Sequence, residues 1–399
     1  MLSAFALLAL AAPPPPAAVA VHFNRDGKVE TRVADGLADR AGGRPVGPDD
    51  PVRIASVSKL VVALGVLRLV EAGRLDLDRD VSDYLGWRLR HPAYPDRPIS
   101  LAQLLGHRSG LNDDTDYALP LDADLETALR DPAAWDKARA PGGDFAYANF
   151  NYPVVAAVIE AATGERFDAA MARLVFRPLG LDACFNWPAC SDAAVARAVV
   201  LHDADGNVVR DDLKGQRPAC PVVPATDGSC DVASYRLGRH GAGFSPQGGL
   251  RISANGLARI GVMLLRRGGG FLKAKSLARL EAMAPVRPTS GEGTGGFFCE
   301  YGMAMHSTGG PALRDPACHD DLFGDGRLRL GHSGDAYGLR SGLWFDLEGG
   351  EGIAYFVTQV PEGQKGIRSA YSAAEERLVD AALRRAANAS PLASPAHRH

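Results

Sequence analysis

Strand-forming segments lie near both ends of this 399-residue chain, and helix-forming segments fill the middle. Near the N-terminus, 17–24 and 29–33 are rich in valine and alanine and are separated by an Asp-Gly turn. Near the C-terminus, three short apolar or alternating runs are bounded by glycines: Leu328–His332, Arg340–Asp346 and Ile353–Gln359. The pattern predicts one sheet made from both ends of the chain and interrupted by a helical insertion.

The helical segments differ in length. A long helical pattern covers 56–72 and stops at Gly73. Shorter helical stretches follow at Leu101–Leu105, Pro153–Ala162 and Ala254–Arg266. A last helix is expected over 373–386, because Ser372 and Glu375 have the spacing of a capping box.

These patterns divide the chain into two structural units. We expect a sheet domain formed by 17–75 plus 286–386, and a helical domain with cysteine-rich loops over 76–285. Residues 1–12 resemble a signal peptide, although no basic residue precedes the apolar run. The tail 387–399 is rich in Ala, Ser and Pro, and we expect it to be disordered. The chain is therefore expected to be exported, to the periplasm or beyond, with no membrane span in the mature protein.

The cysteines fit an oxidising compartment. Six cysteines are present, and an even number in an exported chain favours disulfides. Their order along the sequence suggests three local bridges: Cys184–Cys190, Cys220–Cys230 and Cys299–Cys318. The alternative is that they are buried free thiols. Neither a C-x-x-C pair nor a His-Glu-x-x-His motif occurs, so the sequence predicts no metal site.

Charge excludes some classes of partner. The net charge is −3 at pH 7 and no basic cluster stands out, which gives no support to nucleic-acid binding. Small-molecule ligands remain open, and oligomeric state is not indicated.

The first motif with chemical content is a serine and a lysine three residues apart. Ser56 and Lys59 would lie on the same side of a helix start, one turn apart. A helix N-terminus favours negative charge and so stabilises an activated hydroxyl. A partly desolvated Lys59 could remove the hydroxyl proton. The alternative for an isolated match is an ordinary serine cap with a solvated lysine.

Two further segments carry candidate residues. Tyr147 could move a proton between nucleophile and leaving group, and Asn149 could hold both a lysine amine and a substrate carbonyl. At the end of a predicted strand lies His332-Ser333-Gly334-Asp335, where the Asp335 N–H could join the Ser56 N–H as an oxyanion hole.

Together, in this order and spacing, the three motifs resemble the penicillin-recognising serine hydrolases, which include class C β-lactamases, D-alanyl-D-alanine carboxypeptidases, D-amino-acid peptidases and esterases. The resemblance covers roughly 17–386, and 104–111 and 247–253 also match the family's pattern. It implies an α+β fold, in which an antiparallel sheet flanked by helices joins an inserted all-helical domain. It also implies Ser56 as nucleophile, Lys59 as general base and Tyr147 as second proton-transfer residue.

The third motif differs from the family pattern. The resemblance implies that Asn149 and the 332–335 segment bind substrate, and that His332 stands where most β-lactamases have a lysine. Histidine is largely neutral at pH 7, and Asp335 could either pair with it or repel an anion, while Arg340 could supply the missing charge. We therefore expect an esterase or peptidase rather than an efficient β-lactamase, acting without a cofactor.

Two other classes of function match the sequence less well. The run Gly331 to Asp335 superficially matches the nucleophile elbow of α/β-hydrolases, but its fifth residue is not glycine and a turn and another strand are expected to follow. A non-hydrolytic receptor or scaffold with the same cleft is the other alternative, and the intact Ser56, Lys59 and Tyr147 argue against it.

Overall fold

A computed structural model describes residues 15–286 and 296–389. The expected signal peptide lies outside these residues, as does the tail beyond 389. The C-terminal helix α10 runs over Ala373–Ala389, so the predicted disorder is wrong for 387–389, which are helical. In the part of the chain that the structure describes, no helix is long and apolar enough to cross a membrane.

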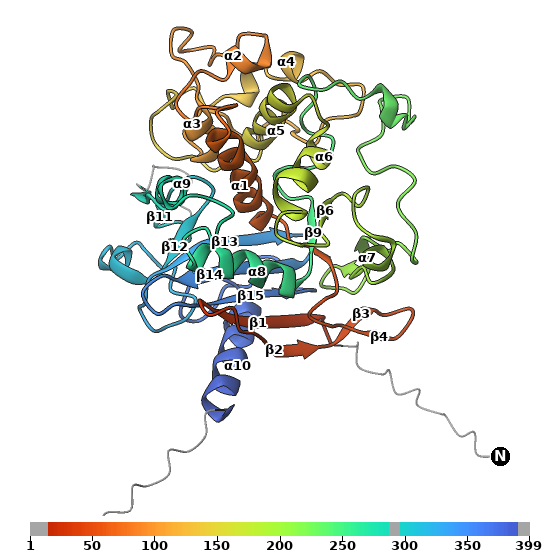
Figure 1. Cartoon of the computed structure of the whole chain (residues 1–399), viewed down its shortest axis with the longest axis vertical. Helices are drawn as coiled ribbons and strands as arrows, with labels where there is room; N and C mark the ends of the chain where they lie inside the picture. Colours follow the sequence, from red (N-terminus) through yellow and green to blue (C-terminus); the bar gives the residue numbers. More distant parts are fainter. Residues whose placement is uncertain (1–14, 287–295, 390–399) are drawn as a thin grey trace, which may run out of the picture.

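An antiparallel sheet forms the lower half of the molecule in Figure 1. Its strands, in spatial order, are β10 (Ala284–Pro285), β11 (Glu300–Tyr301), β12 (His306–Thr308), β13 (Arg329–Ala336), β14 (Leu339–Asp346), β15 (Glu351–Val357), β1 (Ala18–Asn24) and β2 (Val29–Asp35). The N-terminal β1 pairs with β15, with Ala18 opposite Val357. The expectation of one sheet made from both ends of the chain is confirmed.

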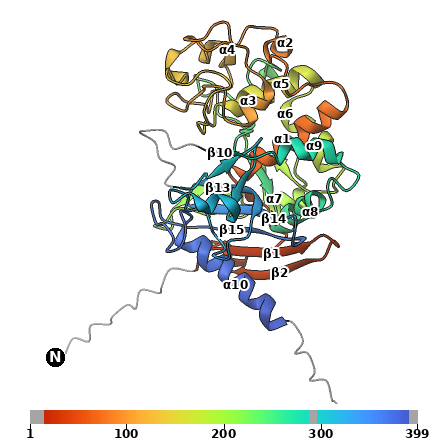
Figure 2. The ribbon, with the colours of Figure 1, turned by 90° about the vertical axis from the view of Figure 1, so that its left-hand side faces the viewer.

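The two faces of this sheet are covered by different helices. Along β1, Val19, Val21 and Phe23 belong to the large core, which also contains the buried side chains of α8 (Ala254–Leu265). The intervening Ala20 belongs to a second core with the apolar residues of α10. This alternation is the two-residue period of a strand buried on both faces. Figure 2 shows α10 packed across the sheet near β1 and β2.

Most of the remaining helices form the upper layer of Figure 1, with α1 running from this layer down to the sheet and α7 lying beside the sheet. The remaining helices are α1 (Val57–Glu71), α2 (Ser82–Leu85), α3 (Leu101–Leu105), α4 (Leu125–Ala128), α5 (Asn151–Thr163), α6 (Phe167–Met171), α7 (Asp192–Ala196) and α9 (Ala274–Leu280). A π-helical turn at Ala172–Phe176 continues α6, and single 3₁₀ turns occur at Pro132–Ala134, Val232–Ser234 and Gly310–Arg314. Helix α1 is apolar around its circumference, which is why it is buried on almost every side.

The predicted boundary of the helical domain needs one correction. Helix α8 falls within 76–285, yet it packs on β1, β14 and β15. Its hydrophobic stripe faces the sheet rather than the other helices, and periodicity alone does not reveal which layer a helix covers. The third motif is also placed differently, since β13 continues through Ala336 rather than stopping near His332.

Short strands outside the eight-stranded sheet form three smaller sheets among the described residues. One small sheet has the order β5 (Val52–Arg53), β9 (Leu250–Ile252) and β6 (Cys184–Phe185). The strands β3 (Leu37–Asp39) and β4 (Arg44–Pro45) pair at one side of the molecule in Figure 1, and β7 (Leu201–His202) pairs with β8 (Val208–Arg210).

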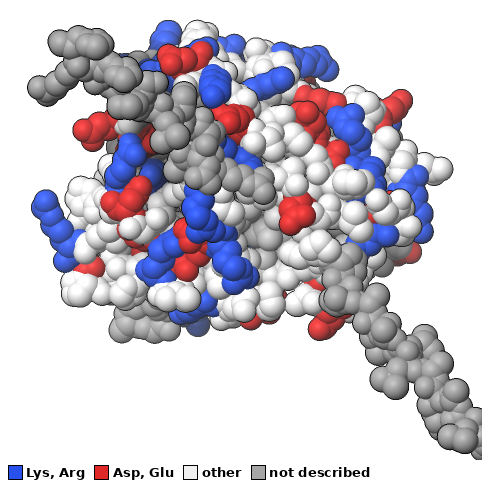
Figure 3. Space-filling model, turned by 90° about the horizontal axis from the view of Figure 1, so that it is seen from below, with Lys and Arg blue, Asp and Glu red and all other residues white. Residues whose placement is uncertain are grey.

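The cysteines form the three expected disulfides, Cys184–Cys190, Cys220–Cys230 and Cys299–Cys318, so the free-thiol alternative is wrong. On the face shown in Figure 3, basic and acidic side chains are interspersed rather than gathered by sign.

Candidate active site

The hydroxyl of Ser56 stands at the start of α1, which begins at Val57. The residue before it, Ala55, has φ of 46°, a left-handed conformation that costs a non-glycine residue roughly 1 kcal/mol or more. This turn directs the chain from β5 into the helix. The side chain of Ser56 does not cap its own helix, so the hydroxyl is available to other groups.

Lys59 lies one turn further along α1 and is completely buried. Its Nζ donates to Ser56 Oγ at 3.0 Å, to Asn149 Oδ1 at 2.7 Å and to the carbonyl oxygen of Gln247 at 2.8 Å. None of these three acceptors is a carboxylate. Burial therefore lowers the pKa of Lys59 to about 7, against a smaller opposing effect of Asp113.

The phenol of Tyr147 completes the contacts of the serine. Its hydroxyl donates to Ser56 Oγ at 2.9 Å. The ring stacks on His107 at 4.3 Å and on Phe298 at 5.2 Å between centroids, which fixes its direction. Burial raises the pKa of Tyr147 above its usual value, so the phenol keeps its proton at neutral pH.

The side-chain amide of Asn149 bonds Lys59 on one side and Asp113 on the other. While its Oδ1 accepts from Lys59, its Nδ2 donates to Asp113 Oδ2 at 2.9 Å. The same carboxylate accepts the backbone N–H groups of Asn149 and Phe150 at 2.8 and 3.0 Å. One amide hydrogen is thus bound to Asp113, which leaves the other for a substrate carbonyl.

His107 supports the backbone that carries Tyr147. Its carbonyl oxygen accepts the N–H of Ala146 at 2.9 Å, and its Nδ1 accepts the N–H of Ala148 at 3.1 Å. Burial, followed by the charge of Lys59, lowers its pKa well below the usual value, so the ring is neutral. These contacts give His107, within the 104–111 segment that matches the family's pattern, a structural role.

Strand β13 approaches the start of α1 at Gly334. A β-carbon at this position would lie 2.4 Å from the carbonyl oxygen of Ile54. Any larger residue would therefore push β13 away from the turn that leads from β5 into α1. Ser341 on β14 also donates to this carbonyl, at 2.8 Å. The glycine of the third motif is therefore required by the close approach of two backbones.

The N–H of Asp335 faces an open strand edge. Ser333, two residues earlier, donates its N–H to His306 Nε2 on the β12 side, at 3.3 Å. Backbone groups two residues apart point to the same side of a strand. Since β12 pairs with β13 only over 329–331, the Asp335 N–H points past the end of β12.

His332 lies behind the site rather than in a position to bind an anion. It is buried, its Nδ1 donates to the carbonyl oxygen of Ser333 at 2.5 Å, and its Nε2 accepts from Tyr301 at 3.0 Å. Burial, then the neighbouring His306 and Lys59, lowers its pKa well below the usual value. The suggested pairing of Asp335 with this histidine is wrong, because the carboxylate pairs with Arg340.

Ser333 is oriented by a second buried histidine. Its hydroxyl lies 3.2 Å from Nε2 of His306, whose Nδ1 lies 3.1 Å from the carbonyl oxygen of Ser307. Burial lowers the pKa of His306 to about 3, so it acts as a neutral acceptor for the serine. The third motif therefore contributes hydrogen-bonding groups but no cation.

Two cavities meet at Ser56 and Asn149. The smaller, about 490 Å³, is also lined by Tyr147, Phe298 and the 332–335 segment, with Lys365 among the other lining residues. The larger, about 1440 Å³, extends toward the cysteine-bearing loops and does not include Tyr147 among its lining residues.

The sequence analysis missed several residues of this site. Asp113 and the carbonyl of Gln247 fix the Asn149–Lys59 pair, and His306 fixes Ser333, yet each comes from a segment distant in sequence. Gln247 was within a segment matched to the family pattern, but a backbone carbonyl leaves no signal in residue type. The predicted Ser56, Lys59, Tyr147 and Asn149 all converge.

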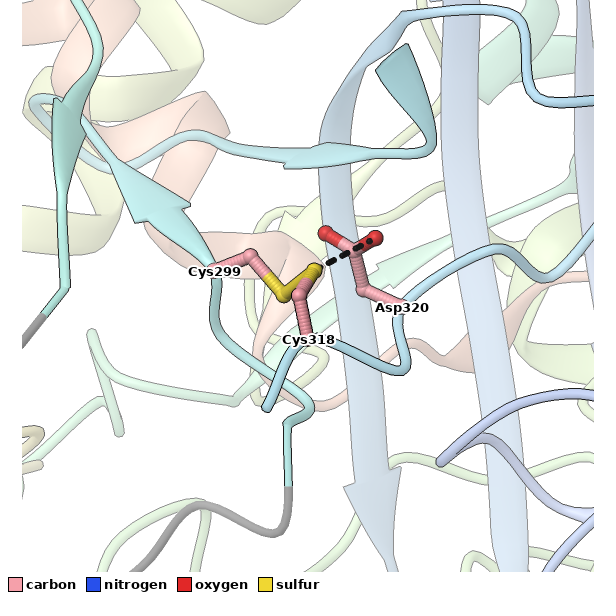
Figure 4. A group of neighbouring side chains, drawn as sticks. All are labelled: Cys299, Cys318 and Asp320. Carbon is pink, nitrogen blue, oxygen red and sulfur yellow. Dashed lines mark hydrogen bonds between the residues drawn. A yellow bond between two sulfur atoms is a disulfide. The ribbon is translucent and has the colours of Figure 1, made fainter. Parts of the chain in front are cut away.

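One group of side chains has the composition of a metal site. Cys299, Cys318 and Asp320 lie together in Figure 4. Because the two sulfurs are joined in a disulfide, neither is a thiolate, the form that binds a metal. Burial raises the pKa of Asp320 to about 7, which weakens it further as a ligand at neutral pH. These residues do not fit a metal ion.

Comparisons with known proteins identify the family and the fold of this chain. The family model described as Beta-lactamase matches residues 16–378. Esterase EstB of Burkholderia gladioli is 38% identical over 178 residues, 40% of this chain and 44% of the esterase. The D-alanyl-D-alanine-carboxypeptidase/endopeptidase AmpH of Escherichia coli (strain K12) is 28% identical over 146 residues, 33% of this chain and 36% of AmpH. The matched region thus spans less than half the length of either relative.

Solved structures share the fold at low identity. The D-amino acid amidase of Ochrobactrum anthropi SV3, complexed with D-phenylalanine, has a TM-score of 0.64 at 19% identity, covering 94% of this chain and 95% of the amidase. A class C beta lactamase from Rhodobacter sphaeroides has a TM-score of 0.64 at 18% identity, covering 94% of each chain. Since the family model spans nearly all of the described residues, the chain belongs to the Beta-lactamase family of serine hydrolases.

Proposed function

We propose that this chain hydrolyses small esters or amides through a covalent acyl-enzyme on Ser56. The observation that carries the proposal is that Ser56 Oγ bonds both the amine of Lys59 and the phenol of Tyr147. A hydroxyl placed between a base titrating near neutral pH and a protonated acid has the partners that acyl transfer requires. No step needs a cofactor.

In the acylation step, the neutral amine of Lys59 takes the proton of Ser56 as Oγ bonds the substrate carbonyl carbon. The N–H groups of Ser56 and Asp335 would stabilise the oxyanion that forms. The bond to the leaving group then breaks, and Tyr147 donates its proton to the departing oxygen or nitrogen. The ammonium of Lys59, 4.9 Å from the Tyr147 ring centroid, offsets the phenolate charge.

Deacylation reverses these proton transfers. The phenolate of Tyr147 takes a proton from water as the water oxygen attacks the acyl carbon. When the bond to Ser56 breaks, Lys59 returns its proton to Oγ, so both side chains recover their starting states. Each step uses groups that already touch the nucleophile.

Esters, D-amino-acid amides or peptides fit this site better than β-lactams. The third motif supplies neutral His332 where a carboxylate-bearing β-lactam would meet a lysine, and Arg340 is already paired with Asp335. The remaining cation on the smaller cavity, Lys365, is exposed and therefore screened by solvent. The similarity to EstB and to the D-amino acid amidase supports this range of substrates.

A substrate panel tests the proposal. Purified protein would be assayed with p-nitrophenyl esters, D-Ala-D-Ala peptides, D-amino-acid amides and nitrocefin, alongside intact-mass detection of acylated protein. We expect ester or amide turnover, weak nitrocefin hydrolysis and an acyl adduct that Ser56→Ala abolishes. Ser234→Ala, at an exposed serine, is the matched control. Nitrocefin as the best substrate would overturn the preference, and substrate binding without turnover would favour a receptor or scaffold.

We also propose that the chain is exported. Three disulfides are typical of an oxidising compartment, and the apolar N-terminus is typical of a signal peptide. Fractionation of the producing cell, with N-terminal sequencing of the mature protein, tests this. A cytoplasmic protein with an intact N-terminus would contradict it.

A further inference from the structure

The larger cavity contains an arginine, Arg53, that forms no ion pair with a carboxylate of the described residues, although the charge of Asp211 acts on it from nearby. Arg53, at the end of β5, is 8% exposed and borders the same cavity as Ser56. Its Nε is buried without a hydrogen-bond partner. Among residues 15–286 and 296–389, no carboxylate or carbonyl bonds its guanidinium, whose contact is with the ring of Tyr337 at 5.0 Å.

The neighbouring charges are already paired. Arg251 lies opposite Arg53 in the β5–β9 pair and bonds Asp211 through Nε and Nη2, at 3.2 and 2.8 Å. Asp211 also accepts from Trp187 Nε1 at 2.9 Å. The carboxylate that could have neutralised Arg53 is thus held by another arginine. Burial, followed by the charge of Arg251, lowers the pKa of Arg53 to about 10, and it remains a cation at neutral pH.

A buried guanidinium without a carboxylate is costly unless something else supplies the negative charge. Arg53 forms part of the cavity wall, and its terminal nitrogens are not among the enclosed, partnerless atoms. They are therefore open to a ligand in the cavity. A guanidinium fork binds a carboxylate through two parallel hydrogen bonds, which is the ligand that its shape and charge favour.

The position of Tyr147 tells which part of a substrate would reach this arginine. The leaving group must lie beside the phenol that protonates it, and Tyr147 lines the smaller cavity. The acyl chain, on the other side of the attacked carbonyl, then extends into the larger cavity. Arg53 lines this cavity and lies three residues before Ser56 in the chain. Extended backbone covers at most about 11 Å over the three residue steps from 53 to 56.

The other acidic groups on this cavity do not neutralise Arg53. Asp335 is paired with Arg340, and Asp113 accepts three hydrogen bonds from Asn149 and Phe150. Asp203 accepts hydrogen bonds from Asp205 and Asn207. The further carboxylates that line this cavity are exposed, at Asp114, Asp116, Asp205, Asp212 and Glu362. Solvent screens exposed charges far more than a buried one. The mouth would disfavour a polyanion but not a single carboxylate bound at depth.

We infer that this enzyme prefers substrates whose acyl group ends in a carboxylate, such as half-esters or half-amides of dicarboxylic acids, with Arg53 binding that carboxylate. The inference rests on the proposed acyl transfer at Ser56 and specifies its substrate class. Arg53 contacts substrate away from the reacting atoms, so it determines specificity rather than the chemical step.

Paired chromogenic esters test this preference. Mono-p-nitrophenyl adipate would be compared with p-nitrophenyl methyl adipate, and the same pair made from suberate, which allows for uncertainty in chain length. The members of each pair share a leaving group and differ by one charge. We expect kcat/KM of wild type to favour the acid by roughly 10- to 100-fold in at least one pair, the range of a charged hydrogen-bonded contact. Equal kcat/KM in both pairs would overturn the inference.

Variants assign the preference to one residue. In Arg53→Gln the acid-to-methyl-ester ratio should collapse toward one, and Arg53→Lys should retain part of it, because a lysine keeps the charge but not the fork. Arg130→Gln, at an exposed arginine on neither cavity, should retain the full ratio. Melting temperatures and the methyl-ester rates report on folding. An undiminished ratio in Arg53→Gln would contradict the assignment. If neither Arg53 variant folds, competition by free adipate against the acid ester in wild type, with no such competition by its dimethyl ester, would support a carboxylate site, and equal inhibition by both would overturn it.

Binding separates this inference from the proposed function. Calorimetry with Ser56→Ala protein should show the mono-adipate ester bound at least about tenfold more tightly than its methyl ester, without any turnover. Turnover that survives in Ser56→Ala would reject the proposed mechanism and leave the binding result intact. Serine-dependent turnover with no preference for the acid would reject the role of Arg53 alone.

Discussion

Gly334 lies directly against the carbonyl oxygen of Ile54, two residues before the candidate nucleophile. An added β-carbon would be 2.4 Å from that oxygen and 3.2 Å from the β-carbon of Ala55. Strand β13 and the turn into α1 therefore share one fixed separation, and the distance from Ser56 to the open edge at Asp335 depends on it.

The first prediction concerns this contact. Gly334→Ala should lower kcat/KM by roughly 100-fold or more, because a shift of about 1 Å disturbs the reacting geometry. It should also lower stability by about 1–3 kcal/mol through overpacking. Ester kinetics and thermal unfolding measure both. Gly47→Ala is the control, since its β-carbon would meet only Asp50, at 3.8 Å. Unchanged kinetics in Gly334→Ala would show that the contact does not set the site.

The second prediction is the pH dependence of turnover. Lys59 must be neutral to accept a proton, and burial lowers its pKa to about 7. Activity should therefore rise with pH up to about 7 and level off above it, falling about tenfold per unit on the acid side. Lys59→Arg should lose roughly 100- to 10,000-fold, because its guanidinium stays charged. A profile that is flat from pH 5 to 9 would be inconsistent with lysine as the base.

The third prediction concerns the effect of the Asp113 charge on the pKa of Lys59. Its charge raises the pKa of Lys59, so Asp113→Asn should move the acid limb of the profile to lower pH. The variant also weakens the bonds that hold Asn149. Asp116→Asn, at an exposed residue of the same loop, should leave the limb in place. A shift to higher pH would contradict the electrostatic sign.

The fourth prediction separates proton donation from attack. Tyr147→Phe removes the phenol and should slow alkyl esters and amides by about 100- to 10,000-fold, because these leaving groups need a proton. p-Nitrophenyl esters, which leave as a stable phenolate, should lose much less. Comparing kcat across leaving groups measures this difference. Equal losses for both would assign Tyr147 to nucleophile activation instead.

The fifth prediction concerns stability. Glu160 is buried, and burial raises its pKa to about 7, although Phe167, Gly238 and Tyr235 donate to it. The native state then holds a proton that the unfolded state has released, so stability should fall as pH rises from about 4.5 to about 7, by up to about 3 kcal/mol. Urea titrations would compare the free energy of unfolding of wild type with that of Glu160→Gln, which loses the acceptor for the Gly238 N–H. Wild type should be the more stable of the two at low pH, and this difference should shrink as the pH rises across the range. A constant difference would contradict it.

Local patterns predicted most of the site. The Ser56–Lys59 spacing and the helix start are encoded within a few residues, and alternation near each end marks the strands that join in one sheet, although it does not give their spatial order. Asp113, Gln247 and Arg53 were not predicted, because their roles depend on which loops meet in space. Residues 333–336 were not predicted as strand, because glycine and aspartate disfavour strands; pairing with β14 overrides that preference.

The charge state of His332 also could not be predicted from the sequence. The resemblance implies that His332 stands where most β-lactamases have a lysine, but whether the histidine is charged depends on its burial against Tyr301 and His306. Sequence analysis left its pairing open, and tertiary contacts decide it.

The pairing of β1 with β15 has a consequence for folding. Ala18 meets Val357, so the central part of the sheet cannot form until nearly the whole polypeptide has been synthesised. Contacts between such distant residues make folding slow. A product truncated before residue 351 would expose unpaired edges on both β1 and β14, a form prone to aggregation.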